Sequence, residues 1–456
     1  MKTKIYGLVL FTLGVLPLSL NAQQWLQGKI SNIRAYDKTG INVFEDPKDS
    51  ATTFNGLAIK WGSGFTEQFQ NLKHENTALN NQGSTVATAG ANRLYPIAPG
   101  FMTSQANLYM DVQLADGIRL NVTSYLSARH HNETWVKGGF IQFDKVPFKG
   151  KFWDDLMKVT TLKIGHFEIN YGDEHFRRTD GGNAIYNPFM EGYIMDAYTT
   201  EIGGEVYVKK NGMFGMLGIT SGMIKGNNDS VWAATIADGN AKRNPSIYLK
   251  AGVDKKVGDN VRVRFSASYY HNNSSAGSGL TLYGGDRTGS NYQNVMEKWV
   301  TGAGTAAAAA SASTAIAFSG RFNPGFSKKI DAFMLNAFVK ASGLELSGAY
   351  ETASGYAKNE TANRSANQFV IDGVYRFGKD ENLFVGARYN TVSARLAGYT
   401  NDVSVNRVAI SAGWFLTKNI LMKGEYVSQV YNDFVNTDYR NGGKFNGYVI
   451  EAVVGF

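Results

Sequence analysis

Segment 171–191 concentrates charged and aromatic side chains that could act on a passing solute. Its ionisable residues include Asp173, Glu174, His175, Arg177, Arg178 and Asp180, which we predict as the constriction. Charged side chains gathered in a narrow passage select ions by sign. The apolar residues of the segment, Phe176, Ile185, Tyr186, Phe189 and Met190, need a surface to pack on. We therefore expect the segment to fold against an inner wall as a pore constriction; an outer loop packed on the rim or on a neighbouring subunit is the alternative.

Residues suited to catalysis are sparse. The chain has six histidines, among them the adjacent pair His130 and His131. Neighbouring residues of a strand point to opposite faces, so this pair cannot readily share one metal ion or one triad. The sequence contains no Gly-x-Ser-x-Gly elbow and no His-Glu-x-x-His helix. We expect no catalytic residue, no metal site and no cofactor.

Alternation of apolar and polar residues predicts the β-strands that would carry the charged side chains. In 118–130, Ile118 and Leu120 fall on one face, and Arg119 and Asn121 on the other. The connections are alternately long and polar or short, and most short ones have the Gly, Asn and Asp residues of tight turns. Short periplasmic turns and long outer loops are typical of an outer-membrane barrel.

We predict an all-β fold, a transmembrane antiparallel β-barrel of about sixteen strands. The strands are expected at 56–69, 103–115, 118–130, 134–145, 159–170, 197–209, 213–224, 245–255, 260–271, 330–340, 344–354, 366–377, 383–394, 404–416, 420–430 and 444–456. Segment 23–55 has no partner in this count and is expected in the periplasm or the lumen. An extra hairpin there would give eighteen strands instead.

Composition and both ends of the chain agree with a barrel. The chain has 51 Gly and 27 Phe but only 8 Pro and no Cys. Residues 1–22 predict a signal peptide cleaved before Gln23, because a basic start precedes an apolar run. No later stretch of about 20 apolar residues exists, so only a closed barrel could span a membrane. The last strand alternates and ends on Phe456, as final barrel strands do. The barrel would then comprise residues 56–456.

The pleat also predicts which charges face the lumen. The expected pore-wall arginines are Arg119, Arg129, Arg262, Arg264, Arg376, Arg388 and Arg407. Inward acids nearly balance the inward cations, and the whole chain carries a formal net charge of +8. This charge favours at most a mild anion preference, and it could equally serve contacts with anionic lipopolysaccharide. No basic cluster with interleaved aromatics predicts nucleic-acid binding.

Three stretches resemble the outer-membrane porins of Bacteroidota, which are related at fold level to the phosphate-selective porin O/P group. They are 33–45, 163–173 and the loop through Arg177 and Arg178. The resemblance implies a trimeric barrel that conducts small solutes and is narrowed by its third long loop. Phosphate-selective members use runs of Arg and clustered Lys along the pore, whereas this loop has two arginines and no lysine cluster.

The sequence therefore predicts a porin in the cell outer membrane that is not an enzyme. Small hydrophilic solutes or ions would diffuse passively through it, and lipid and lipopolysaccharide would surround a homotrimer. One alternative is a structural or secretion-partner barrel that docks another protein through segment 272–328. A barrel enzyme is the other alternative.

Overall fold

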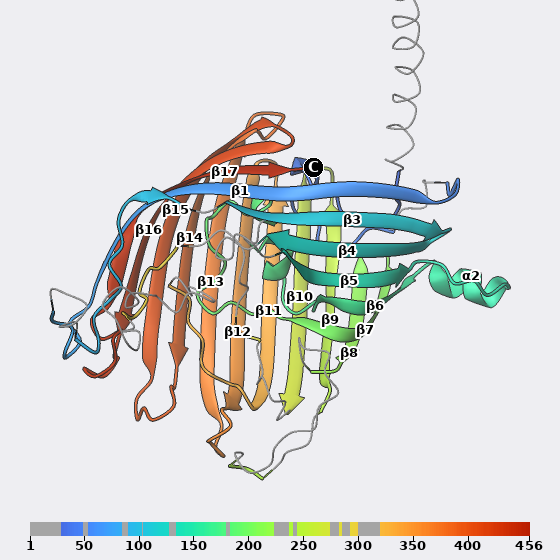
Figure 1. Ribbon diagram of the computed structural model, residues 1–456. Coiled ribbons are helices and arrows are strands. Elements are labelled where there is room, and N and C mark those ends of the chain that lie inside the picture. Colours follow the sequence, from blue (N-terminus) through green and yellow to red (C-terminus); the bar gives the residue numbers. More distant parts are fainter. Residues whose placement is uncertain are drawn as a thin grey trace, which may run out of the picture.

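The computed structural model describes residues 29–48, 53–83, 90–102, 104–126, 134–178, 183–222, 237–239, 244–273, 282–284, 292–299 and 320–456. One antiparallel sheet dominates them (Figure 1). Its strands are β1 (Ala58–Glu75), β2 (Gly100–Phe101), β3 (Gln105–Ala115), β4 (Ile118–Leu126), β5 (Thr134–Phe143), β6 (Thr160–Glu168), β7 (Thr200–Lys210), β8 (Met213–Thr220), β9 (Ser246–Val257), β10 (Val261–Asn273), β11 (Lys329–Ala341), β12 (Leu344–Tyr356), β13 (Arg364–Phe377), β14 (Leu383–Ala394), β15 (Val403–Thr417), β16 (Ile420–Asn432) and β17 (Lys444–Gly455). The helical elements are η1 (Lys38–Gly40), α2 (Lys151–Met157), η3 (Glu174–Arg177) and η4 (Asn183–Ile185).

The sheet closes on itself through β1. From β3 to β17 each strand pairs with the next one along the chain, and β1 pairs with β3 on one edge and with β17 on the other. The closing register runs from Gly64 opposite Gly455 to Glu75 opposite Lys444. The two-residue β2 pairs only with Phe69 and Gln70 of β1. Sixteen long strands therefore form the barrel, and the predicted count is confirmed.

The outward face of the barrel is apolar and the inward face is largely polar. On β10 the predicted alternation is confirmed: Phe265 is exposed, whereas Arg264 and Ser266 are buried. Nearly every long strand exposes a large apolar residue on the outer face. These residues include Trp61, Leu108, Ile141, Ile164, Val206, Leu217, Leu249, Leu335, Leu346, Ile371, Val385, Ile410, Tyr426 and Ile450. This pattern is typical of a barrel whose outer surface meets lipid.

Segment 146–158, predicted as a short connection, contains α2, which starts after Gly150 in a backbone conformation (φ 124°) that favours glycine. The predicted strand 118–130 is described only to Leu126, and residues 127–133 lie outside the described residues. In 29–48 the only regular element is η1, so the described part of the N-terminal segment supplies no extra hairpin. No helix in the described ranges is long and apolar enough to cross a membrane.

Depth along the outer wall should decide the cost of a charge there. Ile410 lies at the middle of β15, and Leu383 is the first residue of β14; both are exposed on the outer face. Ile410→Arg should lower the free energy of unfolding by about 2–4 kcal/mol, and Leu383→Arg by about 0–1 kcal/mol. Urea unfolding of the protein in lipid vesicles measures both values. Equal costs at the two positions would contradict the assigned membrane depth.

Candidate functional site

The long connection between β6 and β7 spans residues 169–199, and its described parts, 169–178 and 183–199, fold into the barrel lumen. Its backbone groups bond to side chains of the inner wall, which removes the cost of burying them unpaired. These bonds run from Met190 N–H to Glu425 (2.9 Å), from Ile194 N–H to Asn390 (2.7 Å), from Met195 N–H to Gln368 (2.8 Å) and from Lys423 to the carbonyl of Phe189 (3.0 Å). The inward folding predicted for this loop is confirmed.

Much of the lumen is packed rather than open. Side chains of this loop join wall residues and two further segments in an apolar cluster. The cluster includes Ile169, Tyr171, Met190, Ile194, Met195, Tyr248, Tyr270, Leu282, Tyr292, Val295, Phe322, Phe326, Met334, Val405 and Val449. Most of the strands that contribute to it belong to the β8–β17 part of the wall. Open space remains along the rest of the wall, from β3 to β7. A separate cavity of about 410 Å³ lies at the short-turn ends of β9 to β14, where Arg262 and Arg376 are among its lining residues.

The N-terminal segment 29–48 also runs inside the barrel. Its side chains reach inward residues of strands that lie far apart around the barrel. The contacts link Ser31 to Gln113 of β3, Tyr36 to Asp111 of β3, Asn42 to Glu345 of β12, Glu45 to Arg264 of β10 and Asp46 to Arg119 of β4. The segment thus narrows the lumen at the end where the short turns lie.

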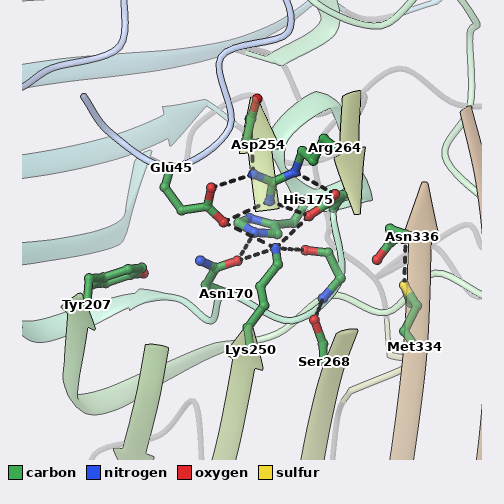
Figure 2. Close-up of polar contacts among 12 residues, drawn as sticks. Glu45, Asn170, His175, Tyr207, Lys250, Asp254, Arg264, Ser268, Met334 and Asn336 are labelled. Atoms are coloured by element: carbon green, nitrogen blue, oxygen red, sulfur yellow. Dashed lines mark hydrogen bonds and ion pairs between the residues drawn. The ribbon is translucent and has the colours of Figure 1, made fainter. Parts of the chain in front are cut away.

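A buried ion network joins this segment, the inward loop and the wall (Figure 2). The guanidinium of Arg264 lies 2.8 Å from Glu45 and 2.9 Å from Asp173. The ammonium of Lys250 lies 2.7 Å from Asp173 and also donates to Asn170 (2.8 Å). Two cations and two carboxylates therefore neutralise one another where three parts of the chain meet.

Three cavities lie in series along the β3–β7 wall. The first, of about 550 Å³, lies at the mouth beside α2 and is lined by Lys48, Asp144, Trp153 and Met157 among others. The second, of about 110 Å³, is lined by Asp46, Gln142, Thr161, Lys163, Glu168 and Lys209 among others. The third, of about 230 Å³, is lined by Arg34, Tyr36, Asn121, Lys137, Phe140 and Tyr186 among others.

Asp144 lies between the first and second cavities, which share no lining residue. This carboxylate accepts hydrogen bonds from Gln142 (2.9 Å) and Thr161 (2.6 Å), both of which line the second cavity. Lys48 of the N-terminal segment lies 3.1 Å from the same carboxylate and also donates to the carbonyls of Met157 and Thr160. The N-terminal segment thus forms a polar septum, defined here as Lys48 and Asp144, between the mouth and the lumen.

The second and third cavities share four lining residues, Lys163, Glu168, His175 and Phe176. Lys163 lies 3.7 Å from Glu205 and stacks over the ring of Phe140 (4.4 Å). Burial, together with the charge of Lys250, lowers the pKa of His175 well below its ordinary value. His175 is therefore neutral at neutral pH. Lys163 and Glu168 are the charged side chains among the residues that the second and third cavities share.

Of the predicted constriction residues that the structure describes, only His175 lines these cavities. Arg178 is 2% exposed and forms an ion pair with Asp196 at 2.6 Å. Arg177 lies 3.3 Å from both Glu174 and Asp372. The geometry favours a structural role for both arginines, because Arg178 is paired within the loop and Arg177 is paired both within the loop and with the wall. Direct contact with a solute stays a prediction.

The remaining predicted constriction residues of this loop are Asp173, Glu174 and Asp180. Asp173 belongs to the buried ion network. Burial raises the pKa of Glu174 to about 7, although Arg388 and Arg177 oppose the shift. Asp180 lies outside the described residues.

The predicted pore-wall arginines lie on the inner face wherever the structure describes them, but each is bonded to neighbouring groups. Their partners are Asp111 for Arg119, Asp254 for Arg262, Glu45 and Asp173 for Arg264, Glu345 for Arg376, Asp372 for Arg388 and Gln429 for Arg407. Arg129 lies outside the described residues. Their contribution to conduction stays a prediction.

Sequence reasoning missed several residues that do line the cavities. Lys163 lies on β6, where Gly165 (φ 149°) interrupts the regular strand conformation and obscures the pleat. Lys48 lies on a segment whose path no periodicity reveals, and Asp144 directly follows the end of β5. The described residues contain no group of three or more His, Cys, Asp or Glu side chains placed to hold a metal ion.

The barrel is similar to solved outer-membrane proteins. It matches the anion-selective porin from Comamonas acidovorans with a TM-score of 0.50 at 9% identity, over 88% of this chain and 100% of that one. It also matches OmpT of Vibrio cholerae and the outer membrane channel DcaP of Acinetobacter baumannii, each with a TM-score of 0.47 at 10% identity, over 89% of this chain and 99% of the other. No protein-family model and no curated protein matches the chain. The first likeness supports the fold.

Acid should loosen the N-terminal segment. Burial would raise the pKa of Glu45, but Lys250 and Arg264 lower it from its ordinary value of 4.5 to about 2. The ion pair therefore stabilises the docked segment above about pH 4.5 and is lost as the pH falls toward 2. A spin label at Thr39→Cys should be immobile at pH 6 and gain a mobile fraction at pH 3.

The matched control is the same label in a Glu45→Gln background. It should be more mobile at pH 6 and respond less to acid, while circular dichroism shows the barrel intact at both pH values. Identical spectra at pH 6 and pH 3 in both backgrounds would contradict the role of this ion pair.

Proposed function

We propose that the protein is an outer-membrane porin through which small hydrophilic solutes and ions diffuse passively along the β3–β7 wall. The observation that carries the proposal is the series of three cavities in a closed barrel whose outer face is apolar. A closed barrel satisfies its backbone in lipid, and a polar inner route gives water and solutes a path across. The packed lumen confines that path to one side.

The charges along the route support a modest preference for anions. The carboxylates of Glu45 and Asp46 each already face an arginine, at 2.8 Å in both cases. Lys209 donates to the backbone carbonyl of Asp46 (2.5 Å) rather than to a carboxylate. Lys163 has its nearest ion-pair partner at 3.7 Å, among the contacts that the described residues make. Apart from these two paired carboxylates, two cations, Lys163 and Lys209, and one carboxylate, Glu168, line the second cavity, which supports a mild excess of positive charge there.

A structural or secretion-partner barrel is the second candidate. The apolar cluster in the lumen favours it, because a solidly packed interior contributes to stability but not to conduction. Most of segment 272–328, which would dock a partner in that case, lies outside the described residues. Conductance separates the two candidates directly.

Location and assembly complete the proposal. The apolar outer wall supports an outer-membrane setting, with lipid and lipopolysaccharide around the barrel and with residues 1–22 removed as a signal peptide. The resemblance to porins supports a homotrimer. The absence of catalytic motifs in the sequence supports a non-enzymatic channel.

Lys163 should set the sign preference of the channel. A unit charge 4 Å away is worth about 1 kcal/mol even in bulk water, which corresponds to about a fivefold change in local ion concentration. Lys163→Gln should therefore lower the anion-to-cation permeability ratio by up to about fivefold. Reversal potentials in a salt gradient across a planar bilayer measure this ratio. Lys149→Gln, on the exposed turn outside the lumen, is the control and should leave it unchanged.

Shortening Lys48 should widen the route. Lys48→Ser removes the ammonium that bridges Asp144 and two backbone carbonyls, so single-channel conductance should rise. Lys145→Ser, at the outer edge of the same mouth cavity, is the control and should have little effect. Unchanged conductance in Lys48→Ser would show that ions do not cross this septum. A wild-type protein that forms no channel would favour the structural candidate.

A further inference from the structure

The connection between β5 and β6 stands apart from the rest of the barrel. Figure 1 shows α2 projecting clear of the wall beyond the ends of these two strands. Trp153 and Met157 of this helix line the mouth cavity and so face the barrel. Phe152 and Leu156 lie one helical turn apart on another face, which no described segment covers. One face of the helix thus faces the mouth cavity of the barrel, and the face with Phe152 and Leu156 is exposed.

The open face is strongly apolar. Phe148, Phe152 and Leu156 are 58%, 69% and 38% exposed. The rings of Phe148 and Phe152 both contact Trp153, with centroids 5.0 and 5.1 Å apart, so the aromatic side chains form one group. Exposed apolar groups of this kind mark contact with a partner or a membrane.

Lysines surround this apolar group. Lys149 and Lys151 are exposed and form no ion pair with any described residue. Lys158 is paired with Asp155 (2.6 Å), and both are solvent-exposed. An apolar face bordered by cations is typical of helices that lie at a phospholipid surface.

We propose that α2 and its flanking residues lie in the headgroup region of the periplasmic leaflet, with Phe148, Phe152 and Leu156 inserted among phospholipids. The inference rests on the membrane location proposed above. Continuity with the lipid-facing wall supports it, because α2 joins two strands whose outward residues, Ile141 and Ile164, are exposed apolar side chains. Lys149 and Lys151 then reach phosphate groups, which fits their lack of an ion pair among the described residues. The helix would anchor the rim of the mouth cavity to the membrane.

The absence of cysteine allows a direct test on the full-length protein. A polarity-sensitive fluorophore is attached at Phe152→Cys or, as the matched control, at Asp155→Cys. Both variants are reconstituted in vesicles of phosphatidylethanolamine and phosphatidylglycerol that contain no other protein. Heat-modifiable migration in gels verifies that each barrel is folded. Quenching is measured with aqueous iodide and with lipids that carry a nitroxide near the headgroup.

Iodide should quench the label at position 152 at least about twofold less than the label at position 155. The nitroxide lipid should quench the label at 152 more than the label at 155. Adding Lys149→Glu and Lys151→Glu should reduce this difference in vesicles that contain phosphatidylglycerol. Equal iodide access at the two positions would overturn the proposal and favour a periplasmic protein as the partner of this face.

Conductance of the same preparations separates this proposal from the proposed channel. An inserted label in a protein that does not conduct would support the membrane anchor and contradict the channel. A conducting protein with an iodide-accessible label at position 152 would support the channel and contradict the anchor.

Discussion

Backbone hydrogen bonding in hydrocarbon is the constraint on which the rest of the structure depends. An unpaired N–H or carbonyl costs several kcal/mol in lipid, so the sheet must have no free edge there. The chain meets this requirement with one long strand, β1, which pairs with β3 over one part of its length and with β17 over another. Strands β4 to β16 each pair with the strand before and the strand after them in sequence.

Closure creates a second problem inside the barrel. Sixteen strands enclose more space than inward side chains can fill, and those side chains are largely charged or polar. The chain brings in its own counter-groups: loop 169–199 and segment 29–48 supply backbone and carboxylate partners for wall residues such as Lys423 and Arg264. The lumen is therefore organised by ion pairs on the inner wall, and the route for solutes is the space that those pairs leave.

The sequence predicts the barrel well because the relevant signal is local. Period-two alternation and turn residues are read within about ten residues, and they place all sixteen strands. The contacts that shape the solute route, in contrast, join residues far apart in the sequence. Lys48 meets Asp144 across 96 positions, and Arg264 meets Glu45 across 219. A pleat shows that Arg264 faces inward, but not that a carboxylate from another part of the chain already neutralises it.

The same reasoning explains why Arg178 and Arg388 line none of the three cavities along the β3–β7 wall. Arg178 and Arg388 are buried against acids because a charge in the interior requires a partner, whereas Lys163 beside an irregular stretch of β6 keeps a looser contact. Runs of charge in a sequence therefore indicate where ion pairs are built. Residues left near water are identified only once the pairs are known.

The path of segment 29–48 also bears on how the molecule assembles. Each hairpin joins neighbours in sequence and forms at low entropic cost, whereas Asn42 must find Glu345 across 303 positions. The seam between β1 and β17 spans a still longer stretch of chain. Contacts of such separation form after the local hairpins, so docking of the segment and closure of the seam both belong to the late steps of assembly. The position of this segment directly before β1 therefore bears on the order of folding events as well as on the final contacts.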